Sequence, residues 1–286
     1  MNTGLLDEIE WAPWVLHPKY GSGFDDLLDQ EWGALENWLP GFHGHLVGEI
    51  CDYSCVIPRF RSVWHFRELL DELEYYGHEP VNTWQQHCFA ADLGQWFEVF
   101  SDITPQSWRG VERIPAGCDG PFIVKGATNS IRGLWGTHCY AADRERLGSV
   151  VVNVVSDSLV GRQETYIRQY VPLDCLVQMV NGMPVGQEYR IFFLDGAELA
   201  RGFYWVNMLP DLDAMGLSDA VDTDMIPDGF VKDVGRRLEG RVRLAAVDVA
   251  RTAGGEWIVV ELNDGAQSGL CGVDANVFYR NLAQRI

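Results

Sequence analysis

Apolar positions recur along the chain with two different periods, and each period predicts one kind of element. In segments such as 24–39 the apolar residues fall three or four positions apart, which is the spacing of an amphipathic helix. Helices are predicted over residues 24–39, 62–76, 82–100, 143–157, 230–240 and 273–286. Ser62 and either Asn82 or Thr83 are suited to cap two of these helices, because their side-chain oxygens accept from free backbone amides.

Short apolar runs between these segments predict strands. They lie at 45–57, 121–126, 137–142, 165–173, 188–196, 198–206, 241–250 and 256–263. Helices therefore alternate with hairpins, which indicates an α+β fold and not an unbroken parallel sheet.

The segment IPAGCDGP (114–121) interrupts both patterns with two prolines and two glycines. We place the main domain boundary there, with an N-terminal domain over 1–118 and a second domain over 119–286. A chain of 286 residues suits one large domain or two modest ones. The first domain is rich in tryptophan but has little clean periodicity.

Charge excludes some classes of partner. The chain has 22 lysines and arginines against 41 acidic residues, a net charge of −19. Such a protein repels nucleic acid and anionic membranes outside a local basic pocket, so we expect neither as a partner.

No run reaches the roughly 18 apolar residues of a membrane span. The acidic start, MNTGLLDEIEW, lacks the basic region of a signal peptide, so we expect a cytoplasmic protein. The sequence gives no indication of oligomeric state.

The seven scattered cysteines favour reduced thiols over a disulfide framework. His43, His45, Cys51 and Cys55 offer a zinc site as an alternative, although their spacing fits no established zinc pattern.

The stretch VVELNDG (259–265) ends a predicted strand with an acid and further oxygen donors. If Gly254 and Gly255 form a tight turn to the preceding strand, Asp248 lies opposite Glu261. Residues opposite each other point to the same face, with β-carbons about 5 Å apart, and Asn263 shares that face. The other face would then be apolar, formed by Ala245, Val247, Val249, Ile258, Val260 and Leu262.

Two carboxylates this close repel each other unless a cation lies between them. Mg²⁺ prefers a few carboxylates together with phosphate oxygens. Asp248, Glu261 and Asn263 are therefore candidate Mg²⁺ ligands. The alternative is a solvated hairpin face with two incidental acids, and the hairpin alone does not favour either.

The run PFIVKG (121–126) ends an apolar strand on Lys125. A lysine in such a place needs an anionic partner. The loop GATNSIRG follows, and its small residues could cradle phosphates while Arg132 adds charge. The alternative is a surface lysine at the end of a strand.

Taken in order, Lys125 with its loop, YIRQYVPL, GQEYRIFF, VDVA and VELNDG resemble the ATP-grasp family, closest to its small stand-alone proteins of bacteria and phages. The resemblance covers about residues 119–275 and implies an ATP-grasp fold with subdomains near 119–171 and 172–286, preceded by an N-terminal α/β domain. It implies ATP and Mg as cofactors.

The resemblance also implies a role for individual residues. Lys125 would hold the α- and β-phosphates, with Ser130 and Arg132 in the loop above them. Gln169, Tyr170 and Val171 match the hinge that binds adenine, and Glu188 matches the acid that binds ribose. Asp248, Glu261 and Asn263 match the Mg²⁺ ligands.

Two positions depart from the family pattern. Gln169 stands where the hinge usually begins with an acid. A basic phosphate ligand usually precedes the lysine, yet residues 82–108 contain no lysine or arginine. Arg59, Arg61 and Arg109 are the candidates to replace it.

The resemblance implies an ATP-dependent carboxylate–amine ligase that forms ADP. A carboxylate is activated as an acyl phosphate, and an amine then displaces the phosphate. Arg190 is the expected catalytic partner of Lys125 and Arg132, since its fork grips a carboxylate with two bonds. Arg241 and Arg243 are alternatives, and Ser268 and Gly269 could line the acceptor site. A phosphotransferase and a degenerate nucleotide-binding module are the alternative functions.

Overall fold

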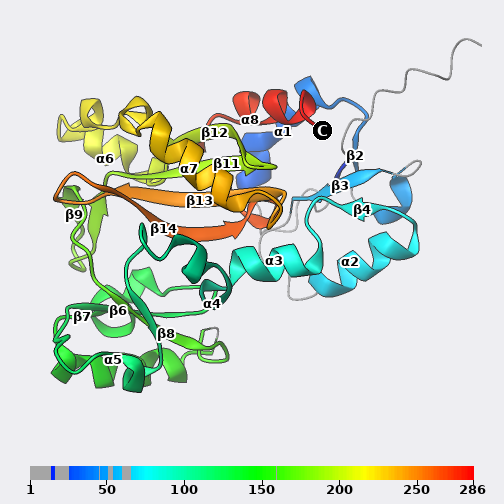
Figure 1. The fold of residues 1–286 in the computed structure, drawn as a ribbon. Coiled ribbons are helices and arrows are strands. Elements are labelled where there is room, and N and C mark those ends of the chain that lie inside the picture. The colour runs from blue at the N-terminus through cyan, green and yellow to red at the C-terminus, as the bar shows by residue number, and fades with distance from the viewer. Residues whose placement is uncertain (1–13, 17–25, 45, 51–53, 60–65, 159) are drawn as a thin grey trace, which may run out of the picture.

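The computed structural model describes residues 14–16, 26–44, 46–50, 54–59, 66–158 and 160–286. The described strands form four sheets of four, two, five and four strands. The five-stranded sheet lies in the middle, a four-stranded sheet lies below it, and the N-terminal sheet extends to one side (Figure 1). The mixture of helices with separate sheets confirms the α+β prediction.

The N-terminal part is a parallel sheet in the order β2-β1-β3-β4, flanked by two helices. Its elements are β1 (Trp14–Leu16), α1 (Asp26–Trp38), β2 (His43–Gly44), β3 (Cys55–Pro58), α2 (Phe66–Tyr75) and β4 (Glu79–Pro80). The strand predicted over 45–57 is largely wrong, because Val47–Glu49 form a 3₁₀ turn and β3 starts at Cys55. The predicted cap Ser62 lies outside the described residues.

The segment that leads to the second sheet is helical, but it is broken. Thr83 caps α3 (Trp84–Ala91), with its side chain accepting from the amide of Gln86. Asp92 ends this helix and caps α4 (Leu93–Trp96), and a 3₁₀ turn, Phe97–Phe100, follows. One continuous helix over 82–100 is therefore wrong. Trp96 and Phe100 are fully buried against the five-stranded sheet, so this segment belongs to the central core.

The small antiparallel sheet has the order β5-β8-β6-β7. Its strands are β5 (Ser107–Arg109), β6 (Phe122–Gly126), β7 (Tyr140–Ala141) and β8 (Thr165–Gln169). Helix α5 (Arg144–Ser156) covers one face, where Leu147, Val150 and Val154 pack against Phe122 and Val124. A boundary at residue 118 stays a proposal, and β5 before it pairs with β8 after it.

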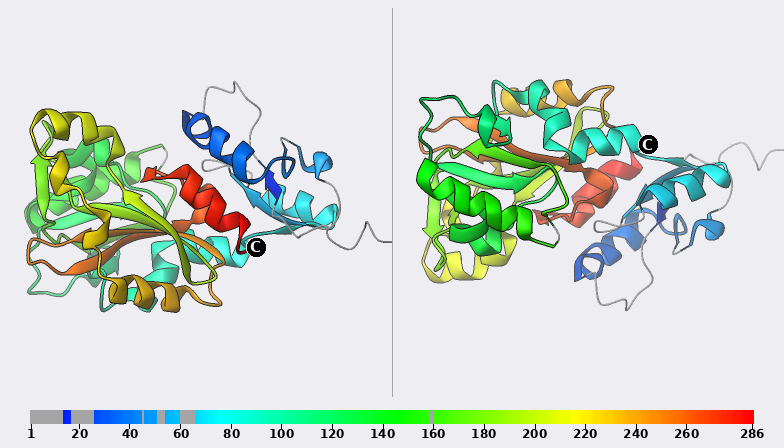
Figure 2. Two further views of the ribbon diagram at one scale, coloured as in Figure 1. Left: turned by 90° about the horizontal axis from the view of Figure 1, so that it is seen from above. Right: turned by 90° about the horizontal axis from the view of Figure 1, so that it is seen from below.

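The five-stranded sheet has the order β14-β13-β11-β12-β15. Its strands are β11 (Glu188–Leu194), β12 (Ala197–Phe203), β13 (Leu244–Arg251), β14 (Trp257–Asp264) and β15 (Gly272–Val273). Helix α7 (Asp228–Leu238) covers one face beside α6 (Leu209–Ala214), while α8 (Ala275–Ala283) and α1 cover the other (Figure 2). Side chains alternate between the two faces along β11, so Glu188, Arg190 and Phe192 point to the same face. Phe192 packs under α8, whereas Glu188 and Arg190 lie beyond the end of that helix.

The remaining connections are short. The hairpin β9 (Cys175–Gln178) and β10 (Pro184–Gly186) was not predicted from the sequence. Further 3₁₀ turns lie at Val111–Arg113, Arg132–Leu134, Val206–Met208, Ser218–Ala220, Thr223–Met225 and Gly265–Gln267, and Trp135–Cys139 form a π-helical turn.

None of the described helices combines the length and the apolar character needed to cross a membrane. The described cysteines are free thiols. His45 and Cys51 of the zinc alternative lie outside the described residues, and within the described part no group of three or more His, Cys, Asp or Glu side chains is arranged to hold a metal.

Candidate functional site

The hairpin β13–β14 brings the two predicted acids together. Asp248 pairs directly with Glu261, as the sequence predicts. The reason differs from the predicted one, because Arg251 pairs with Trp257 and the register shifts between Asp248 and Val249. The turn is therefore longer by one residue than a tight Gly254–Gly255 turn, and a bulge restores the expected pairing.

The bulge also changes which side chains face the core. Val259 and Leu262 are fully buried in the core beneath α7, together with Val247 and Val249. Ile258 and Val260, which simple alternation assigns to the core, instead line a pocket beside Glu261. The prediction of an unbroken apolar face is therefore wrong at these two positions.

Each acid of the hairpin is ion-paired. Lys125 donates to Glu261 Oε1. Arg190 holds Asp248 with two bonds, Nε to Oδ1 and Nη2 to Oδ2, both 2.8 Å long. Asp248 is 0% exposed and Lys125 4%, so Lys125 is not a surface lysine. Strand β6 thus places its lysine against the hairpin of the other sheet.

These contacts set the ionisation of the acids. Burial opposes the charged form of Glu261, but the charges of Lys125 and Arg132 outweigh it and lower the pKa to about 2. Burial raises the pKa of Asp248 and of Glu188, while the neighbouring arginines Arg190 and Arg132 act in the opposite direction. The bidentate contact favours the ionised form of Asp248, and it raises the pKa of Arg190 in turn.

A pocket between the two sheets gathers all the predicted nucleotide ligands. It is lined by Lys125, Ser130, Arg132, Gln169, Tyr170, Val171, Glu188 and Glu261. Its apolar walls are Ile123, Trp135, Leu173, Met183, Pro184, Trp205, Ile258 and Val260. A site that combines charged groups with extensive apolar walls suits a nucleotide.

The hinge is held by its own backbone. The amide of Gln169 donates to the Gln106 carbonyl at 2.8 Å, and the amide of Tyr170 donates to the Pro121 carbonyl at 2.9 Å. The Tyr170 ring contacts Trp135 and Tyr140 edge to face, with Trp135 stacked on Tyr140. This aromatic group forms a rigid wall of the pocket.

Arg168 is a pocket residue that the sequence analysis missed. Its guanidinium donates to the Val260 carbonyl at 2.6 Å and to the hydroxyls of Thr104 and Ser107. Burial lowers its pKa to about 10, although Glu261 opposes the shift. A charged residue inside the strand TYIRQ was the available signal, because a buried arginine needs oxygen partners. Trp135 was missed as well, and nothing in the sequence marks it as a pocket wall.

Arg132 lies between the nucleotide pocket and a second hollow. Its Nη1 approaches Glu188 Oε1 at 3.4 Å, and its guanidinium lies over the rings of Tyr204 and Trp205. The second hollow has a volume of about 620 Å³. Its lining includes Thr128, Asn129, Arg190, Asn207, Asn263, Gln267, Ser268, Gly269 and Cys271.

The two cavities share Ser130, Arg132 and Glu261. Each also borders a buried donor that has no partner among the described residues, Trp205 Nε1 at the first and Gln267 Nε2 at the second.

The loop that borders the second hollow is fixed from the N-terminal part. Arg59 donates through Nη1 to the carbonyls of Gly265, Ala266 and Ser268, at 2.7, 3.1 and 2.8 Å. Its other nitrogens hold Glu31. Arg59 is thus a clamp on this loop, and the suggestion that it replaces the upstream phosphate ligand is wrong.

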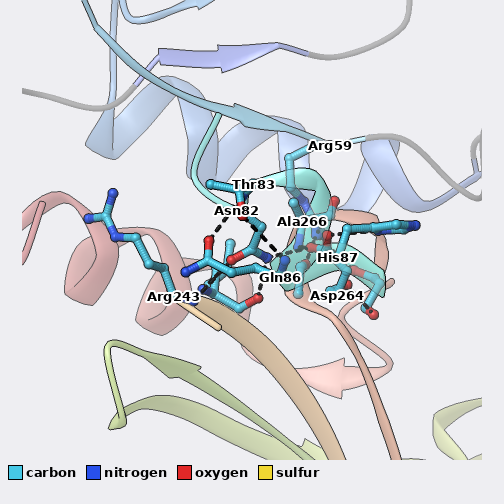
Figure 3. Close-up of polar contacts among 11 residues, drawn as sticks. Arg59, Asn82, Thr83, Gln86, His87, Arg243, Asp264 and Ala266 are labelled. Atoms are coloured by element: carbon cyan, nitrogen blue, oxygen red, sulfur yellow. Dashed lines mark hydrogen bonds and ion pairs between the residues drawn. The ribbon is translucent and has the colours of Figure 1, made fainter. Parts of the chain in front are cut away.

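Asp264 anchors the start of the same loop (Figure 3). Its Oδ1 accepts from Asn82 at 2.8 Å and from the amide of Ala266, and its Oδ2 lies 3.0 Å from His87 Nδ1. Asn82 also bonds the backbone of Arg243 and Leu244. Helix α3 and its cap are thereby joined to the end of β14.

Among the described residues, the other candidate arginines do not line either cavity. Arg109 is exposed and paired with Glu164, and Arg61 lies outside the described residues. Arg243 is paired with Asp195, and Arg241 lies over the Phe89 ring. Of the three arginines proposed for a substrate carboxylate, Arg190 is the one that borders the hollow.

The residues fit a hard divalent cation by the chemistry of their donors. Asp248, which is fully buried, lies opposite Glu261, and Glu261 and Asn263 border the second hollow, so carboxylate and amide oxygens lie close together where the two cavities meet. Lys125 and Arg190 neutralise the two carboxylates in this structure, so a metal ion would compete with these cations.

Comparison with known proteins agrees with this architecture. The profile of a family described as an ATP-grasp domain matches residues 76–282, more than half of the chain. No curated protein sequence matches.

Many solved structures are similar, and three of them illustrate the likeness. A RimK domain ATP-grasp protein from Sphaerobacter thermophilus is 16% identical with a TM-score of 0.58, covering 94% of this chain and 98% of that one. The ATP-grasp ligase PsnB, solved with a phosphomimetic variant of its minimal precursor, Mg and ADP, is 13% identical with a TM-score of 0.54, covering 95% and 97%. The D-alanine–D-alanine ligase of Bacillus anthracis, complexed with ATP, is 11% identical with a TM-score of 0.55, covering 89% and 86%. At these identities the likeness establishes the fold. Together with the family match, it shows that the chain belongs to the ATP-grasp domain family.

Proposed function

We propose that this protein is an ATP- and Mg-dependent ligase that activates a carboxylate as an acyl phosphate and joins it to an amine. The observation that supports this proposal is the meeting of two cavities at Ser130, Arg132 and Glu261. A triphosphate that extends from the aromatic wall of the first cavity would place its terminal phosphate where a carboxylate in the second cavity can reach it.

The nucleotide roles follow the lining of the first cavity. Lys125 and Arg132 neutralise phosphate charge, and Ser130 contributes a hydroxyl beside them. The backbone at Gln169, Tyr170 and Val171 contacts the adenine, and Glu188 accepts from the ribose hydroxyls. ATP and Mg are the cofactors of this proposal, in keeping with the nucleotides and Mg in similar structures.

Asp248, Glu261 and Asn263 would hold Mg²⁺, which lowers the charge on the phosphates when it is bound. Arg190 would orient the reacting carboxylate and stabilise the negative charge that develops on it, since it borders the second cavity and Mg²⁺ held by Asp248 would free the two nitrogens of its fork that bind that acid in the present arrangement. The carboxylate oxygen attacks the terminal phosphorus and ADP leaves. The amine then attacks the acyl carbon, and phosphate and a proton leave. The substrates are a small-molecule or peptide carboxylate and amine, and a cytoplasmic location is part of the proposal.

Hydroxylamine trapping tests this proposal. With Mg²⁺, ATP and an acid panel of amino acids, peptides and N-acylated acids, hydroxylamine should give ADP and a hydroxamate, because it intercepts the acyl phosphate. Arg190→Ala should depress hydroxamate formation more than nucleotide binding. A stable phosphoester with ADP and no hydroxamate would identify a phosphotransferase. ATP binding without ADP release across the panel would identify a nucleotide-binding module.

A further inference from the structure

The charges around the second cavity restrict what can bind there. Among the described residues that line it, Arg132 and Arg190 are the cations and Glu261 is the single carboxylate. The other polar side chains carry neutral amides, hydroxyls and a thiol: Thr128, Asn129, Ser130, Tyr204, Asn207, Asn263, Gln267, Ser268 and Cys271. The cavity therefore offers donors and positive charge far more than negative charge.

The nearby acids are already committed. Glu261 is paired with Lys125, Asp248 with two nitrogens of the Arg190 fork, and Glu188 with Arg132. A substrate ammonium would have to displace one of these cations, or be held by neutral oxygens alone beside two guanidinium groups. Both outcomes are unfavourable in a partly buried cavity, where charges interact more strongly than in water.

Gln267 is a neutral residue in a fixed part of the lining. Its Nε2 is buried without a partner among the described residues, and the side chain lines the cavity. Gln267 ends the turn Gly265–Gln267, whose backbone is held by Arg59 and Asp264. The position of Gln267 in the cavity wall is thus fixed, and its uncharged amide adds no negative charge to the lining.

On the basis of the proposed function, we propose that the activated acid carries no ammonium group near its reacting carboxyl, as in an N-acylated amino acid or a carboxyl within a peptide. The class excludes free zwitterionic amino acids as preferred acids. The volume of about 620 Å³ is in the range of ligand pockets, large enough for an acylated residue.

Matched acid pairs test this class. L-glutamate, L-aspartate and L-alanine would each be compared with their N-acetyl derivatives on the full-length protein loaded with Mg·ADP, with the thermal midpoint as the binding readout. The same pairs would be assayed with Mg·ATP and hydroxylamine. We expect the N-acetyl acids to bind and turn over at least about tenfold better, because the like-charge contact is absent.

A substitution at Gln267 supplies the second arm. Gln267→Glu adds a carboxylate to the cavity lining and should shift the preference toward the free amino acids by about tenfold or more. Gln267→Asn keeps the amide and is the matched control, which should retain the preference for acylated acids. The thermal midpoint of each ligand-free variant checks that the fold is intact.

If the unaltered protein binds the free amino acids as well as or better than the N-acetyl acids, the proposed class of acid without an ammonium group is wrong. Hydroxamate formed from those free amino acids would still support the ligase proposal. The absence of any midpoint shift with all three N-acetyl acids would also overturn the class. Selective binding of the N-acetyl acids without hydroxamate would support the class and contradict the ligase proposal.

Discussion

Charged side chains of both signs gather between the two cavities. Among the described residues there, Lys125, Arg132, Arg168 and Arg190 are positive, and Glu188, Asp248 and Glu261 are negative. This local positive excess stands in a chain whose net charge is −19. A site of this sign attracts the anionic phosphates that the overall charge would repel.

The Lys125–Glu261 pair should contribute to stability in the free protein. Glu261→Gln leaves Lys125 buried without an anion, so the free energy of unfolding should fall by about 3 kcal/mol. The double change Lys125→Met with Glu261→Gln should recover part of that loss, because no charge is left unpaired. Urea denaturation of the single and double variants measures both effects. If the losses in unfolding free energy from Lys125→Met and Glu261→Gln simply add in the double variant, the two side chains do not stabilise each other.

The pH dependence of this contribution has a definite sign. The pKa of Glu261 is lowered in the folded protein from an ordinary value of 4.5 to about 2. The carboxylate therefore stabilises the fold above its ordinary pKa, and this contribution is lost as the pH falls from that value toward 2. The free energies of unfolding of the unaltered protein and of Glu261→Gln, measured as the pH is lowered, should converge over this range. A constant difference between the two down to low pH would show that the ionised carboxylate is not the cause.

At the scale of elements, the sequence predicted those with long periodic patterns or clear caps. Helix α5 and the capped start of α3 are examples. The prediction failed where tertiary contacts override local pattern. The bulge in the β13–β14 ladder turns Ile258 and Val260 toward a pocket, which alternation cannot show. The strands β1, β2 and β4 have three residues or fewer, too short for a periodic pattern.

The candidate site was predictable to the extent that its residues lie at the ends of predicted strands. One apolar run ends at Lys125 and another ends at Glu261, while a third begins at Glu188. Arg168, Trp135 and the Arg59 clamp depend on contacts between distant segments, and their positions carry no local signature strong enough to place them. The pairing of Asp248 with Glu261 was predicted from register, through a turn that differs from the observed one.

The Arg59 clamp joins the N-terminal sheet to the loop of the second cavity. Arg59→Met removes the bonds to three carbonyls and leaves Glu31 buried without its partner, so the free energy of unfolding should fall by about 3–5 kcal/mol. Tyr279→Phe is the matched control, because it removes a single hydrogen bond to Glu31 and should cost about 1 kcal/mol. Chemical denaturation of both variants measures the difference. Equal, small losses would show that the clamp contributes little.

At the scale of the whole molecule, the nucleotide pocket is shared by two sheets that have separate cores. The small sheet contributes Ile123, Lys125 and Gln169, while the five-stranded sheet contributes Ile258 and Glu261. A ligand in this pocket contacts both sheets at once. Its binding energy therefore favours the arrangement in which they are closed on each other.

Hydrogen exchange should detect this coupling. A non-hydrolysable ATP analogue with Mg²⁺ should slow amide exchange in both β6–β8 and the end of β14, because opening either side would release the ligand. Lys125→Ala should abolish the protection in both regions at the same ligand concentration, since it removes the phosphate partner at the junction. Lys232→Ala, on α7 outside the pocket lining, is the matched control and should preserve it. Protection confined to the small sheet would mean that the nucleotide binds without joining the two sheets, and the hairpin acids would then have no part in holding its phosphates.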